Sequence, residues 1–127
     1  MKVQKTIYWV STGLLVLGMC ATFINYFFNP AFKTIFAHLG FPDWFRIELG
    51  IAKLFGAFAL AIPLIPPRIK EWAYFGFFIS FSSAIIAHYN SGDPLLNIIA
   101  PLMMFVILVV SYVTYHKITV PKDFLNK

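Results

Sequence analysis

Three ionisable side chains lie in otherwise apolar stretches of the chain, and they are the first candidates for chemistry. Lys53 is near the middle of the stretch 45–62, which also contains Glu48, and His88 is near the end of another apolar stretch. A lysine at the centre of a bilayer costs roughly 2.5–3.5 kcal/mol, so it usually faces a bundle interior or a wet cavity with a partner. A carboxylate at the same depth as an imidazole is typical of an acid–base pair.

The elements that must position these residues are helices long enough to cross a membrane. The chain has 127 residues, of which 60% are hydrophobic and 12% charged, whereas soluble domains carry about 25% charged residues. Spans of about 20 residues with short connections fill the whole length. The predicted fold class is therefore all-α, a four-transmembrane-helix bundle in a single domain covering residues 1–127. The predicted spans are 6–28, 45–62, 71–90 and 95–116.

A short amphipathic interfacial helix is predicted between the first two spans. Asn29 suits a helix N-cap and Pro30 the first helical position, and Gly40 with Pro42 ends the helix. Its apolar residues follow the spacing i, i+3, i+4, i+7: Phe32, Ile35, Phe36 and Leu39. The pattern predicts a helix that lies at the membrane interface and covers the bundle.

Depth in the membrane, at about 1.5 Å per helical residue, predicts which polar residues share a level. Lys53 and Ser80 are at equal distance from the inner ends of their spans, and Glu48 and His88 are both close to the outer ends. We therefore predict that Lys53, Ser80, Ser83, Glu48 and His88 line a ligand-binding pocket that opens toward the outer leaflet.

The same residues have structural alternatives that the sequence leaves open. Lys53 shares a helix face with Gly50 and Ala57, and small residues allow close helix packing, so Lys53 could be a structural peg bonded to Ser80, Ser83 or a carbonyl. Glu48 and His88 are candidates for catalysis, or for a structural hydrogen bond at the interface. Glu48 and Lys53 are five residues apart, which is about 140° around a helix, so they do not form a good internal pair.

Other polar residues indicate anchoring rather than chemistry. Glu71, Trp72 and Tyr74 are predicted as structural or interfacial anchors at the start of the third span. The three histidines have neither the i,i+4 spacing nor a cysteine cluster, so no metal site is predicted. A single cysteine, Cys20, excludes an intrachain disulfide and a C-x-x-C redox motif.

The formal net charge of +5 predicts topology rather than nucleic-acid binding, because the basic residues lie at the ends of apolar stretches. With both termini cytoplasmic, seven basic residues fall inside and two outside, as the positive-inside rule requires. The inside set is Lys2, Lys5, Arg68, Lys70, Lys117, Lys122 and Lys127, and the outside set is Lys33 and Arg46. The predicted location is the plasma or inner membrane, with multiple spans.

Several short motifs, in order, resemble the DoxX-like family of small four-helix membrane proteins. They are LGFP at 39–42, KLFG at 53–56, KEWAY at 70–74 followed by Gly76, AH at 87–88 and GD at 92–93. The resemblance covers roughly residues 6–116. Glu71, Trp72, Tyr74, Lys53 and His88 match motif positions, but the resemblance gives them no roles. Glu48 lies outside the matching motifs.

The resemblance implies a four-helix membrane bundle, in a family named after a subunit linked to quinone-coupled sulfur oxidation. We therefore expect a non-enzymatic module that binds a quinone or lipid, or an accessory subunit of a membrane redox complex. The alternatives are an enzyme that acts on a lipid-soluble substrate through Glu48, Lys53 and His88, and a small oligomeric carrier. No cofactor motif is readable, and the lipid bilayer is the one partner that composition itself indicates.

Overall fold

The computed structural model describes residues 2–119, which form five helices and no strands, so the all-α prediction is confirmed. The C-terminal lysines Lys122 and Lys127, which the topology prediction counts, lie outside the described residues. In chain order the helices are α1 (Lys2–Phe28), α2 (Pro30–His38), α3 (Asp43–Ala61), α4 (Pro67–Asn90) and α5 (Leu95–Thr119).

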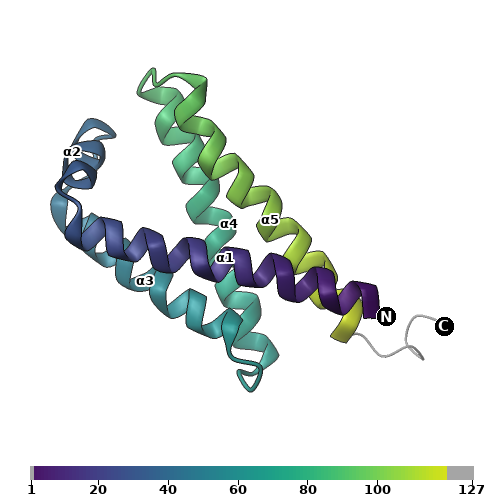
Figure 1. Ribbon diagram of the computed structural model, residues 1–127. Helices are drawn as coiled ribbons and strands as arrows, with labels where there is room; N and C mark the ends of the chain where they lie inside the picture. The colour runs from purple at the N-terminus through teal and green to yellow at the C-terminus, as the bar shows by residue number, and fades with distance from the viewer. Residues whose placement is uncertain (1, 120–127) are drawn as a thin grey trace.

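The four long helices make a closed ring of contacts. Going round the ring, α1 touches α3, α3 touches α4, α4 touches α5, and α5 returns to α1. The short α2 packs on α1 and α3, at the end of the molecule opposite the N-terminus (Figure 1). The α4–α5 turn reaches that same end, so α2 and this turn face each other across the top of the molecule.

By length and apolar composition, two of the described helices, α1 and α5, could cross a membrane. The charged residues Arg46, Glu48 and Lys53 lower the apolar content of α3, and α4 begins with a basic turn. The four-span arrangement therefore stays a prediction.

The mainly apolar interior of the ring contains a small network of hydroxyl groups. Thr12 of α1, Tyr74 of α4 and Ser111 of α5 are nearly or fully buried, and the Ser111 hydroxyl is 2.7 Å from both the Thr12 and the Tyr74 hydroxyl oxygens. This network joins three helices. Tyr74 is thus a core residue rather than an interfacial one, whereas Trp72 projects outward and Glu71 contacts His116 of α5 at 2.5 Å.

The predicted start of α2 is present in detail. The Asn29 side chain accepts a hydrogen bond from the amide of Ala31, and Pro30 takes the first helical position. Beyond α2, Gly40 has a φ of 88°, a conformation that side-chain-bearing residues rarely adopt. This turn directs the chain into α3, where the Arg46 guanidinium donates to the Tyr26 carbonyl oxygen of α1.

Candidate functional site

Four of the five residues predicted to bind a ligand line one cavity of about 230 Å³, which we call the α2 cavity. Lys53 comes from α3, and Ser80, Ser83 and His88 come from α4. The apolar face of α2 covers the cavity with all four of its predicted members: Phe32, Ile35, Phe36 and Leu39. The sequence therefore places these residues at a common site, although their role in binding stays a prediction.

Lys53 is nearly buried, with 8% of its surface exposed. Its ammonium group donates a hydrogen bond to the Tyr26 hydroxyl at 3.1 Å and lies 5.1 Å from the centre of the same ring. The ring of Phe81 is 5.8 Å away on another side. The Lys53 partner is therefore an aromatic residue of α1, not the α4 serines that the sequence offered as partners.

Glu48 is the predicted residue that the structure does not bring to the site. Its side chain is exposed on α3 and does not line the α2 cavity. His88 pairs instead with Asp93, whose carboxylate accepts a hydrogen bond from His88 Nδ1 at 2.7 Å. The expected pairing of Glu48 with His88 is replaced by this contact within the α4–α5 turn.

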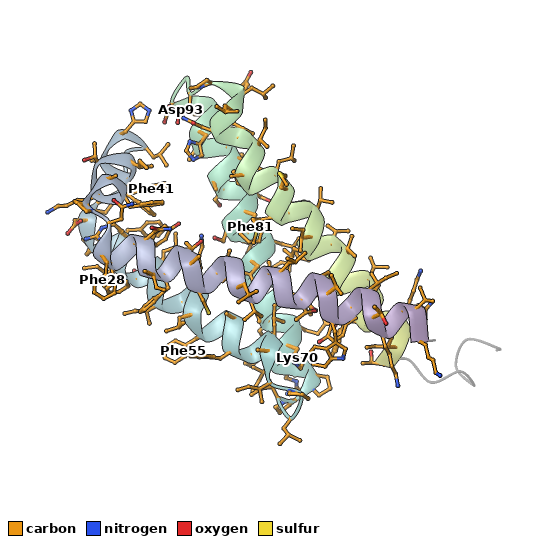
Figure 2. All side chains as sticks on the ribbon, in the orientation of Figure 1. Phe28, Phe41, Phe55, Lys70, Phe81 and Asp93 are labelled. Carbon is orange, nitrogen blue, oxygen red and sulfur yellow. The ribbon has the colours of Figure 1, made fainter. Side chains whose placement is uncertain are left out.

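The Asp93 carboxylate has a second partner on α2. Its other oxygen accepts a hydrogen bond from His38 Nε2, also at 2.7 Å, so the His38–Asp93–His88 cluster connects α2 to the α4–α5 turn (Figure 2). The cluster borders a neighbouring cavity of about 630 Å³, and His88 lines both cavities. The hydrogen bonds from His88 and then from His38 hold the pKa of the Asp93 carboxyl below its usual value.

This cluster joins α2 to the α4–α5 turn by hydrogen bonds, and its removal should make α2 open more often. We expect Asp93→Ala to speed amide hydrogen exchange in α2 (Pro30–His38) several-fold. Because the Asp93 pKa is lowered on folding, the link is complete above about pH 4 and is lost as the pH falls through the lowered pKa. Hydrogen exchange measured by mass spectrometry at pH 7 checks the variant.

The matched control is Asp43→Ala, which removes a carboxylate by the same chemical change. The carboxylate of Asp43 pairs with Arg46 of the same helix, so its loss should leave the exchange of α2 nearly unchanged. Equal exchange in wild type and Asp93→Ala would show that apolar contacts alone hold α2.

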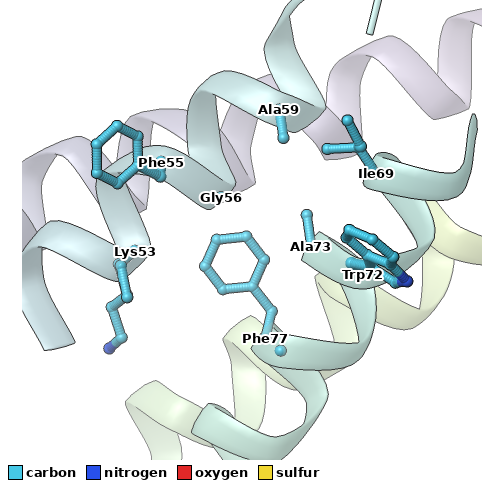
Figure 3. A pocket seen from close by; sticks show the side chains of 10 residues that line it. Lys53, Phe55, Gly56, Ala59, Ile69, Trp72, Ala73 and Phe77 are labelled. Carbon is cyan, nitrogen blue, oxygen red and sulfur yellow. The ribbon is translucent and has the colours of Figure 1, made fainter. Parts of the chain in front are cut away.

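A second cavity, of about 300 Å³, lies between α3 and α4 and is called here the α3–α4 cavity. Figure 3 shows the Phe77 ring beside Gly56, with Lys53 at one end and Trp72 at the other. A Cβ added to Gly56 would lie 2.7 Å from this ring, whereas one added to Gly76 would meet nothing within 4 Å. Gly56 thus makes a close contact possible, but Gly76 borders open space.

The small residues Gly76, Ser80, Ser83 and Ala84 of α4 line cavities. Their helical spacing would equally fit close packing of α4 against α3. The residues that α4 buries are large: Lys70, Tyr74, Phe77 and Phe81. Small side chains leave room here because aromatic neighbours hold the helices apart.

Two residues of importance to the site are not predicted from the sequence analysis. Tyr26 lies close to the end of its predicted span, and Asp93 lies in the short turn between the third and fourth predicted spans. The predicted topology contains a signal for Asp93, since four spans with both termini cytoplasmic place His38, His88 and Asp93 at the outer side. Among residues 2–119, no three histidine, cysteine or acidic side chains are arranged to hold a metal ion.

Comparison with known proteins gives one match. The model of the DoxX-like family matches residues 10–111, a segment that includes every residue of the α2 cavity named above. No curated protein and no solved structure matches the chain.

Proposed function

The chain belongs to the DoxX-like family, and on this premise we propose that it is a four-span membrane protein that binds a small amphipathic molecule in the α2 cavity. Family membership and the apolar helices fit a membrane protein. The proposal adds that α1, α3, α4 and α5 all cross the bilayer as a single domain, and that the module has no catalytic activity of its own.

The apolar outer surface supports four spans rather than two. Large hydrophobic side chains are exposed on α3 and α4 as well as on α1 and α5, and a bilayer would cover them. The clearest examples on the two less apolar helices are Phe55, Phe58, Phe75, Ile79 and Ile86.

Both termini are proposed to be cytoplasmic, in the plasma or inner membrane. The N-terminus, the α3–α4 turn and the C-terminal end of α5 lie at the same end of the molecule (Figure 1). Five of the eight lysines and arginines in residues 2–119 lie in or next to these segments, which is the distribution expected for a cytoplasmic face. The α2 cavity is then near the outer leaflet.

The observation that carries the binding proposal is that Lys53 is nearly buried beside a cavity with few hydrogen-bond partners. Its ammonium group is nearly buried, has a single hydrogen-bond partner in Tyr26 and borders a cavity that also holds two serines. An ammonium group has three N–H donors, so two remain for a ligand. The same module could stand alone or serve as an accessory subunit of a membrane redox complex.

An enzyme that uses Glu48, Lys53 and His88 together draws less support, because Glu48 does not share the cavity. A hydrogen bond to Asp93 engages His88 Nδ1, so this face of the ring is already occupied. A binding role requires only Lys53 and the cavity wall.

The test is the substitution Lys53→Met, which removes the charge and keeps a long side chain. We expect wild-type protein purified in mild detergent to retain a small molecule in native mass spectrometry, and the variant to lose it. The variant should insert and fold normally, because Lys53 is a costly buried charge whose single hydrogen-bond partner is the neutral Tyr26 hydroxyl. Circular dichroism and thermal unfolding check the fold.

Lys33→Met is the matched control, since it removes an exposed lysine of α2 by the same chemical change. This variant should keep the molecule. If Lys53→Met folds and keeps the molecule as well, Lys53 is a structural peg and the binding proposal is wrong.

A further inference from the structure

Lys53 has no counter-ion in the described part of the chain. The four acidic residues there are Asp43, Glu48, Glu71 and Asp93. Three of them contact Arg46 or a histidine, and Glu48 is exposed. No ion pair of residues 2–119 includes Lys53. A charge that is nearly buried without a partner is expensive, so proteins normally pair it.

The second buried lysine shows what a structurally satisfied ammonium group looks like in this fold. Lys70 is 4% exposed and donates to the carbonyl oxygens of Ala59 and Leu60 at 2.9 and 3.2 Å. Lys53 donates to one neutral hydroxyl and otherwise faces the rings of Tyr26 and Phe81. Aromatic faces attract a cation, but they supply no formal negative charge.

The surroundings of Lys53 define the rest of the ligand. Ser80 and Ser83 bring hydroxyl donors to the same cavity, whose other walls are largely the aromatic and aliphatic side chains of α2 and α3. The volume of about 230 Å³ is below the roughly 300–1,000 Å³ of typical small-molecule pockets. This space accepts a headgroup and the first part of one chain, but not a two-chain lipid.

We infer that the ligand of the α2 cavity is a single-chain amphiphile with an oxyanion headgroup, a carboxylate or a phosphate, that pairs with Lys53. This inference rests on the proposed function and narrows it. The headgroup supplies the missing counter-charge and accepts the free donors of Lys53 and the serines. The apolar body lies against α2, and a neutral molecule such as a quinone satisfies the hydrogen bonds but not the charge.

The experiment compares matched probes on the purified full-length protein. Palmitate and hexadecyl phosphate carry the two oxyanions, and hexadecanol and a short-chain ubiquinone are the neutral probes. We expect at least one oxyanion probe to bind about tenfold or more tightly than hexadecanol. Hydrogen bonds to charged groups are stronger than neutral ones, and the difference in binding free energy corresponds to about a tenfold change in affinity. The tighter of the two identifies the headgroup.

Three variants locate the effect. Lys53→Met should abolish the preference for the oxyanion probes, and Lys53→Arg should retain it, which keeps the comparison informative if the methionine variant folds poorly. Gly76→Leu fills the α3–α4 cavity, where an added side chain meets open space, and should leave binding unchanged. Loss of binding in Gly76→Leu would place the ligand in that other cavity and overturn the inference.

The outcomes separate the inference from the proposed function. Equal binding of hexadecanol and the oxyanion probes, or tighter binding of the ubiquinone, would refute the oxyanion headgroup while the binding function stands. Absence of binding by all four probes, together with no copurifying molecule, would refute both.

Discussion

Lys70→Met should lower the free energy of unfolding by about 2 kcal/mol, one of the two largest losses of stability expected here. The Lys70 ammonium group donates to two carbonyl oxygens at the end of α3. The helical partner of the Ala59 carbonyl would be the amide of residue 63, but Pro63 has no N–H. Removing Lys70 leaves this acceptor unpaired, at roughly 1–3 kcal/mol, and removes a cation from a helix C-terminus.

Denaturation of the detergent-solubilised protein measures this effect, and Lys53→Met provides the contrast. Both substitutions remove a nearly buried lysine, but only Lys70 stabilises helix carbonyls. Lys70→Met should therefore lower the stability of the fold but still bind the ligand. Lys53→Met should keep the stability of the fold but lose the ligand. Equal stability of Lys70→Met and wild type would contradict the capping role.

Gly56→Ala should destabilise the fold by about 1–3 kcal/mol, the usual range for overpacking. The added Cβ would lie 2.7 and 2.9 Å from two atoms of the Phe77 ring. Phe77 is 3% exposed and stacks on Phe81 with ring centroids 5.8 Å apart, so moving the ring away from the methyl group would disturb this stack. Thermal unfolding of the variant in detergent measures the loss.

Two further variants make this prediction specific. Gly76→Ala is the control, because its Cβ meets nothing within 4 Å and alanine favours helices by roughly 0.5–1 kcal/mol. It should be neutral or stabilising. Phe77→Leu should restore part of the stability of Gly56→Ala, since a smaller side chain gives the methyl group space. A loss of equal size at Gly56 and Gly76 would exclude the steric explanation.

The sequence predicts the local structure of this protein well. The apolar stretches and their breaks place all five helices, because proline, glycine and capping residues act within a few positions of themselves. The N-cap at Asn29 is confirmed. Helical spacing also predicts that Lys53 points inward with Gly50 and Ala57, and all three are buried.

Pairings across helices are predicted less well, because depth along a helix does not fix direction around it. Glu48 and His88 are predicted to share a level, but Glu48 is turned about 140° from Lys53 and is exposed. Only the α4 members of the predicted site share the cavity with Lys53. The angle of about 140° between Glu48 and Lys53, which follows from the sequence, predicts better than depth that Glu48 does not share the cavity with Lys53.

The role of small and aromatic residues on α4 depends on packing that no single helix determines. A stripe of small residues fits both close helix contact and an open cavity. In this protein the stripe borders cavities, because the rings of Phe77 and Phe81 lie between α3 and α4 and keep the small residues from contacting α3. The partner of Lys53 was missed for the same reason, since Tyr26 reaches it only after α1 and α3 have packed.

The contacts between α1 and α3 also bear on how the protein is made. A helix that carries Arg46, Glu48 and Lys53 enters a bilayer poorly alone. Its polar partners, the carbonyl and the hydroxyl of Tyr26, belong to a helix that leaves the ribosome earlier. In the proposed four-span arrangement, the order of synthesis allows α3 to enter the membrane against α1 before α4 and α5 are translated, with the Arg46 and Lys53 hydrogen bonds to Tyr26 already formed.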